Sequence, residues 1–214
     1  MTSERTRLNR LAEKGVTDRA ALDRLLDASI LAHVGLADGN GGAVVIPTAA
    51  ARDGDRILIH GSTGSGWMRR AADGGQACVT VTELDGVVVA RSSFESSFRY
   101  RSAVLFGTFT RLPAAELSRA LDLLTERFIP GRVAELRRPS SREVAATMVL
   151  AMPIQEWSLK VSAGWPEDEP EDIAGDAWAG VLEYAPRQFG APQPAPDLHS
   201  GIAVPPSVRA LTSP

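Results

Sequence analysis

The chain has 214 residues, 44% of them hydrophobic, and its 23 basic and 26 acidic side chains give a formal net charge of −3. This length supports one well-buried domain, and the slightly acidic balance gives no positive field for nucleic acid. No run of eighteen apolar residues predicts a membrane span, and the charged first residues do not resemble a secretory signal. The single Cys78 excludes an internal disulfide and a cysteine zinc cluster. We therefore expect a cytoplasmic protein that neither binds nucleic acid nor enters a membrane.

The first sixty residues predict two short helices and an antiparallel meander. One helix is expected to end at Gly15, and the next to begin near Thr17 and Asp18, which are good N-caps. Strands are predicted over residues 30–37, 43–51 and 56–60. Glycine- and aspartate-rich turns at residues 38–42 and 52–55 connect them.

The remaining pattern is also mainly that of strands. Residues 77–82 alternate between apolar and polar, and Asp85-Gly86 predicts a turn into a further strand at 87–90. A long strand over 100–112, a helix over 113–128, a capping box at 140–143 and a last strand over about 148–162 follow. We predict a mainly β, α+β fold, a six-stranded antiparallel barrel with helices outside, as one domain over residues 1–184. Residues 185–214 are predicted to be a Pro-rich, irregular tail.

A Gly/Ser loop at residues 61–66 is the most informative segment. It follows a strand ending at His60 and precedes a short helix that carries Arg69 and Arg70. A strand that opens through Ser62, Thr63 and several glycines predicts free backbone N–H groups suited to a phosphate. An ordinary flexible loop with a helix N-cap gives the same pattern. The loop is neither a Walker loop nor a dinucleotide fingerprint, because the Gly-Lys ending and the parallel βαβ unit are both missing.

Other residues could carry chemistry near such a loop. Tyr100 and Ser102 should face one side of their strand and Arg101 the other, where Arg101 could bind a phosphate through two hydrogen bonds or simply be solvated. Lys160 stands out because Lys14 is the only other lysine. Either a ligand contact or a solvated strand end explains it.

The three histidines predict no metal cluster. His33, His60 and His199 lack metal-ligand spacing, and no Ser-His-Asp or cysteine nucleophile pattern can be recognised. We therefore assign no metal site and no catalytic nucleophile.

Several segments in the same order resemble the pyridoxamine 5'-phosphate oxidase-like flavin-binding proteins, and their nitroimidazole-resistance-type branch in particular. The likeness spans residues 18–183. Its segments are Val45–Thr48, Leu58–Ser62, Cys78–Gly86 with Val89–Ser92, Tyr100–Val104, Pro130–Arg132, Lys160 and Trp178–Val181.

The resemblance implies a split β-barrel that forms a homodimer and holds FMN at the subunit interface. The FMN-binding residues that it implies are Pro47, Thr48, His60, Gly61, Ser62, Thr63, Ser65, Arg69, Thr80, Tyr100, Arg101, Ser102 and Lys160. One position departs from the family, because Gly66 follows Ser65 where relatives usually have a basic residue. Loss of that cation would remove about 1–3 kcal/mol of binding. Replacement by Arg69, weaker binding or a different cofactor would each account for it.

Two functions follow from the resemblance. The first is an FMN-dependent oxidoreductase that acts on a small molecule, with the flavin ring as hydride carrier. The second is a binding protein without turnover that holds flavin or haem, with His60 or His33 as the iron ligand. A deazaflavin in place of FMN is the third alternative.

Overall fold

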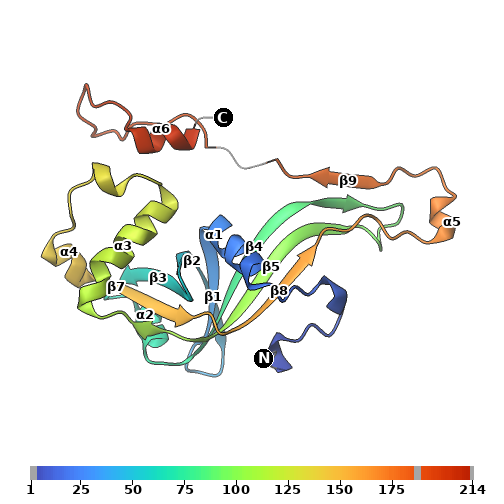
Figure 1. The fold of residues 1–214 in the computed structure, drawn as a ribbon, viewed down its shortest axis with the longest axis horizontal. Helices are drawn as coiled ribbons and strands as arrows, with labels where there is room; N and C mark the ends of the chain where they lie inside the picture. The colour runs from blue at the N-terminus through green and yellow to red at the C-terminus, as the bar shows by residue number, and fades with distance from the viewer. Residues whose placement is uncertain (1–3, 186–188, 213–214) are drawn as a thin grey trace.

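The computed structural model describes residues 4–185 and 189–212, and within them the chain forms one bent antiparallel sheet (Figure 1). The strand order is β6-β7-β3-β2-β1-β4-β5-β8, and β9 pairs with β4 outside this path. The strands of the described part are β1 (Leu31–Ala37), β2 (Ala43–Asp53), β3 (Arg56–Ser62), β4 (Gln76–Val89), β5 (Ser97–Thr108), β6 (Thr110–Arg111), β7 (Thr147–Pro153), β8 (Glu156–Ser162) and β9 (Gly180–Glu183). The predicted split barrel with helices is confirmed, with nine strands in the described residues rather than six.

Helices lie on both sides of the sheet, and α1 and α4 are capped as the sequence indicates. They are α1 (Arg19–Ala28), α2 (Gly66–Ala72), α3 (Ala114–Phe128), α4 (Ser141–Ala146), α5 (Pro170–Ile173) and α6 (Pro206–Thr212), with 3₁₀ turns η1 (Glu4–Thr6), η2 (Ala12–Lys14) and η3 (Val133–Glu135). Asp18 caps α1 by accepting from the N–H groups of Ala20 and Ala21. Ser140 and Glu143 form the predicted capping box of α4.

Two apolar cores define the two faces of the sheet. The inner face closes over Leu22 and Leu25 of α1 and Met68 of α2, all of which are fully buried. The outer face is covered by α3 only at its β2–β3–β7 end, where Leu58 and Val149 pack against the helix. No helix of residues 4–185 and 189–212 covers the outer face of β1, β4 and β5, so side chains there remain open.

The turn predicted at Asp85-Gly86 is wrong. β4 runs straight through these residues, and Asp85 is instead the extra residue of a β-bulge between Leu84 and Gly86. Gly86 does not form a turn but allows the backbone of β9 to lie close to β4. A Cβ at this position would lie 2.6 Å from the backbone oxygen of Leu182 in β9.

Two predicted long strands are each broken. The strand expected over 100–112 splits at Phe109, which is fully buried, into β5 and β6. The strand expected over 148–162 splits at Ile154 into β7, which pairs with β3, and β8, which pairs with β5. The Ile154 N–H donates to the Asp55 backbone oxygen at 2.7 Å, which extends the β3–β7 pairing up to the break.

The barrel carries an arm and a C-terminal tail. β4, β5 and β9 extend away from the barrel, and Asp168 anchors the loop after β8 by accepting from the backbone N–H of Arg91 and from its guanidinium (Figure 1). The tail was predicted to be irregular, but residues 206–212 form α6. Its Ser207 N–H donates to the Glu135 carboxylate at 3.0 Å. None of the helices in the described ranges is long and apolar enough to cross a bilayer.

Candidate functional site

The open outer face of the sheet collects side chains that lie far apart in the sequence. His33 of β1 stands between Pro47 of β2 and Thr80 of β4 in one cross-strand row. Cross-strand partners point to the same side of a sheet. The predicted site residues Pro47 and Thr80 are therefore neighbours of the same histidine.

A second row carries hydroxyl and amino groups. Ser102 of β5 pairs with Thr82 on one side and Lys160 on the other, and the Thr82 and Ser102 hydroxyl oxygens are 3.1 Å apart. Tyr100 lies two residues along the same face of β5. The predicted residues Tyr100, Ser102 and Lys160 thus share the open face, where they can hydrogen-bond a flat ligand.

His60 lies on the same outer face, at its border with α3. It pairs with Val149 of β7 and alternates with Leu58, which α3 covers. Its Nδ1 is buried and has no hydrogen-bond partner among the described residues. Burial lowers the pKa of His60 from its ordinary value of 6.5. The imidazole is therefore neutral at pH 7, with an Nδ1 that is buried and without a hydrogen-bond partner among the described residues.

Three backbone amides of the Gly/Ser loop, which were expected to be free, are hydrogen-bonded within the chain. The Thr63 N–H donates to the Ala146 oxygen at 2.9 Å, and the Ser65 N–H donates to the Ser62 oxygen at 3.0 Å. The Gly64 N–H donates to Ser62 Oγ at 3.1 Å. The loop is held by its own hydrogen bonds, so these three amides cannot hold a phosphate without breaking them.

An arginine-lined groove lies immediately beside this loop. It has a volume of about 790 Å³ and is lined by Thr63, Arg69 and Arg70 from one segment and by Arg111 of β6. Asp73 is the carboxylate in its lining. Arg69 was expected near a phosphate, whereas Arg111 was missed because it lies forty residues away with no motif around it.

Three other predicted residues are directed elsewhere. Thr48 pairs with the buried Ala32 and so faces the barrel interior. A Cβ at Gly61 would lie 3.0 Å from the Met68 side chain, so this glycine makes room for α2. Ser65 is the N-cap residue of α2 without a side-chain capping bond.

Arg101 also faces away from the open surface. Its Nε and Nη2 donate to the two carboxylate oxygens of Asp85 at 2.9 and 2.7 Å. This hydrogen bonding raises the pKa of Arg101. The orientation opposite to Tyr100 and Ser102 is as predicted, but the guanidinium already has an anionic partner.

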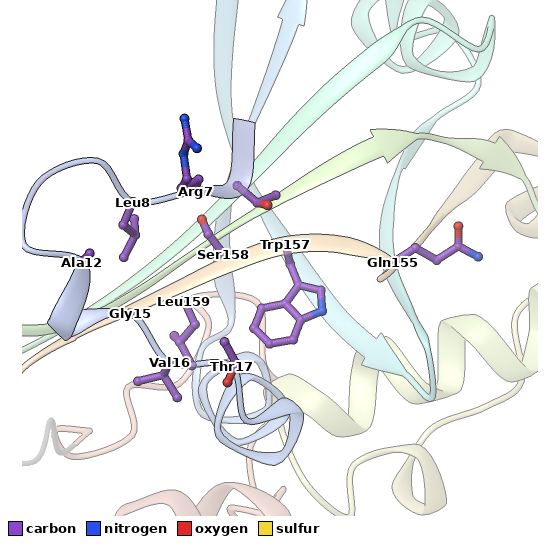
Figure 2. Close-up of a pocket in the computed structure, with 11 residues that line it drawn as sticks. Arg7, Leu8, Ala12, Gly15, Val16, Thr17, Gln155, Trp157, Ser158 and Leu159 are labelled. Atoms are coloured by element: carbon purple, nitrogen blue, oxygen red, sulfur yellow. The ribbon is translucent and has the colours of Figure 1, made fainter. Parts of the chain in front are cut away.

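A second hollow lies at the β8 edge of the sheet (Figure 2). It encloses about 400 Å³ between the N-terminal turns and β8, and the Trp157 indole ring lies beside Thr17 and Val16. The Val16 N–H donates to the Leu159 oxygen at 2.9 Å and closes part of this edge. The sequence offered no signal for this hollow.

The open face is also unusually apolar for a surface. Leu31 and Val45, on the barrel part, are 52% and 65% exposed. The band continues along the arm, where Phe98 and Leu182 flank Val87 in one cross-strand row. Large apolar surfaces of this kind mark contact sites.

The architecture, a split antiparallel barrel with an outer face open over β1, β4 and β5 and a basic groove beside α2, defines a class of small β-barrel proteins. The family model for pyridoxamine 5'-phosphate oxidase matches residues 18–161. The chain belongs to this family. None of the curated proteins is similar to it.

Solved structures extend the similarity to the arm and tail. The FAD and haem binding protein from Mycobacterium smegmatis is 55% identical over 93% of this chain and 97% of its own, with a TM-score of 0.89. The flavocytochrome Anf3 from Azotobacter vinelandii is 33% identical over 98% of this chain and 97% of its own, with a TM-score of 0.90. A proposed 5-nitroimidazole antibiotic resistance protein from Bacteroides thetaiotaomicron is 19% identical over 69% of this chain and 86% of its own. Its TM-score of 0.59 shows a shared barrel fold.

Proposed function

We propose that this protein binds a flavin on the open outer face and uses it in electron transfer with a small molecule. The observation that carries the proposal is the cross-strand gathering of Thr80, Ser102 and Lys160 on a helix-free face. The arginine groove beside the Gly/Ser loop carries guanidinium groups of the kind that bind phosphate. The names of the Mycobacterium smegmatis and Azotobacter vinelandii proteins, which describe a flavin in each, support the same assignment.

The chain's own side chains then have distinct tasks. A bound flavin supplies the hydride or electron chemistry. The Tyr100 and Ser102 hydroxyls hydrogen-bond and orient the ring, and the Lys160 ammonium stabilises negative charge that develops on it. This chemistry needs no side chain as a nucleophile.

We further propose that a second copy of the chain covers the open face. Leu31 and Val45 expose apolar surface beside the polar rows, which a monomer would leave in water. A dimer would exclude water from the flavin ring, as the family resemblance predicts. Leu31→Glu should therefore yield monomers and lose flavin, whereas Leu136→Glu, at a similarly exposed leucine on the η3 side, should do neither.

The direct test of the proposal is the spectrum of the purified full-length protein. We expect flavin absorbance that bleaches on reduction, and mass spectrometry of the released cofactor should identify FMN, FAD or a deazaflavin. A colourless protein that takes up no added flavin would contradict the proposal.

Haem is the second candidate ligand, and His60 is the observation that favours it. Its neutral imidazole has a buried nitrogen without a partner in the described part of the chain, and neutral imidazole is the form that binds iron. Both similar proteins have names that describe a haem or a flavocytochrome. Haem titration should give a Soret band that His60→Ala abolishes and His199→Ala preserves. An unchanged Soret band in His60→Ala would assign the iron ligand elsewhere.

A further inference from the structure

His33 lies in a largely apolar part of the open outer face. It is on β1 between Pro47 of β2 and Thr80 of β4, and all three side chains point to the same side of the sheet. The imidazole is exposed, and it forms no hydrogen bond or ion pair with any residue of the described ranges. The packing of the fold therefore does not account for a histidine at this position.

The strand positions next to His33 carry no charged side chain. Leu31, two residues earlier in β1, is 52% exposed, and Val45 of β2 is 65% exposed. On β4 the neighbours are Thr80 and Cys78, and burial raises the pKa of the Cys78 thiol. A charged ligand would find no counter-ion beside this imidazole, whereas an uncharged ring would cover exposed apolar surface.

His33 also lies beside the groups that we assign to the flavin ring. Thr82 follows Thr80 on the same face of β4, and the Thr82 hydroxyl oxygen lies 3.1 Å from that of Ser102. Diagonal neighbours on adjacent strands are about 7–8 Å apart, and His33 is one such step from Thr82. A molecule in contact with His33 can therefore touch a ring that Ser102 orients.

We propose that His33 binds the small molecule that exchanges electrons with the flavin, and that this substrate is a flat, uncharged ring compound with a carbonyl oxygen. An imidazole has an N–H donor for a carbonyl in either protonation state, and Pro47 and Leu31 supply apolar surface for the ring. The second copy proposed to cover this face would close over the bound substrate. This inference rests on the proposed flavin function and adds to it the residue that selects the substrate.

Binding is tested first on the full-length, flavin-loaded and oxidised protein, in which no turnover occurs. The probe is duroquinone, whose four ring methyl groups prevent addition of the Cys78 thiol. Its addition should shift the imidazole NMR signal of His33, which is assigned with His33→Leu. The signal of His199, in the exposed tail, should not move.

The kinetic test compares two electron acceptors in reoxidation of the photoreduced protein. His33→Leu should raise the half-saturating duroquinone concentration about tenfold, because one hydrogen bond to a carbonyl is lost. His33→Gln keeps a donor and should stay within about threefold of the wild type. Ferricyanide needs no hydrogen bond to a carbonyl, so its rate should change less than about twofold in either variant. His199→Leu is the control and should change neither reaction.

Other results separate this inference from the proposed function. A His33 signal that duroquinone does not move, or an equal loss with duroquinone and ferricyanide in His33→Leu, would overturn the substrate role while flavin binding stands. Loss of a haem Soret band in His33→Leu but not in His60→Ala would assign His33 to the iron and also overturn it. A protein that takes up no flavin would remove the function and the inference together.

Discussion

Arg101 and Asp85 form a two-point ion pair between β5 and β4, with donor–acceptor distances of 2.9 and 2.7 Å. The pair lies at the β-bulge, where the barrel continues into the arm. Both side chains are 37% exposed, so solvent screening limits its contribution to stability.

The pair gives the first prediction. Arg101→Gln should lower the free energy of unfolding by at most about 1 kcal/mol, because partly exposed ion pairs contribute little. The flavin affinity of this variant should stay within about twofold of that of the wild type, because the Arg101 guanidinium faces away from Tyr100 and Ser102. Urea unfolding and flavin titration measure the two quantities. A tenfold loss of flavin affinity in a stable variant would show that Arg101 releases Asp85 to bind the cofactor.

The capping box gives the second prediction. Ser140 Oγ accepts from the Glu143 N–H, while the Glu143 carboxylate accepts from the Ser140 N–H at 2.7 Å. Ser140→Ala should cost about 1 kcal/mol of stability, because one N-terminal N–H of α4 loses its acceptor. Ser141→Ala, at the next and equally exposed serine, is the control and should cost much less. Equal midpoints of urea unfolding for the two variants would contradict a cap at Ser140.

Gly86 gives the third prediction. An alanine Cβ there would meet the Leu182 backbone oxygen at 2.6 Å, so β9 must move away from β4. Gly86→Ala should cost about 1–3 kcal/mol and speed hydrogen exchange in residues 180–183. Gly75→Ala is the control, because nothing lies within 4 Å of its added Cβ. Unchanged exchange in β9 would show that the strand can shift without losing its pairing.

His60 gives the fourth prediction, a dependence of stability on pH. Because burial lowers the pKa of the folded imidazole, the unfolded chain takes up this proton first as pH falls below 6.5. Stability should therefore be complete above pH 6.5 and decline below it, towards the lower pKa of the folded state. His60→Gln should make the midpoint of urea unfolding depend less on pH between 7.5 and 5.5. His199→Gln, in the exposed tail, should leave that dependence unchanged. A wild-type midpoint that is constant over this range would contradict a buried neutral His60.

The sequence predicted local structure correctly wherever that structure depends on residues of a single short segment. Asp18 and Ser140 mark helix starts through side chains that bond the next turn, and both caps are present. The hairpin at residues 38–42 needs only its own glycines, two of which have positive φ. Strand alternation alone also placed Tyr100 and Ser102 opposite Arg101.

The failures share one cause, which is a partner distant in the sequence. Asp85-Gly86 has turn chemistry, but Arg101 and β9 hold it in a straight strand. Arg111 gains significance only because β6 brings it beside α2. The Thr63 N–H, expected to be free in the Gly/Ser loop, is bonded because Ala146, eighty residues later, accepts it.

The bulge at Asp85 also decides which way the arm faces. Before it, odd-numbered residues of β4 such as Val79 and Val81 point inward, and after it the even-numbered Val88 is the buried one. The one extra residue therefore makes the even-numbered residues point inward after the bulge, where the odd-numbered residues did so before it. If Asp85 instead paired as an ordinary strand residue, Val87 would point inward and Val88 outward, and the apolar band would stop where the barrel stops. The bulge is therefore what keeps barrel and arm on a common contact surface.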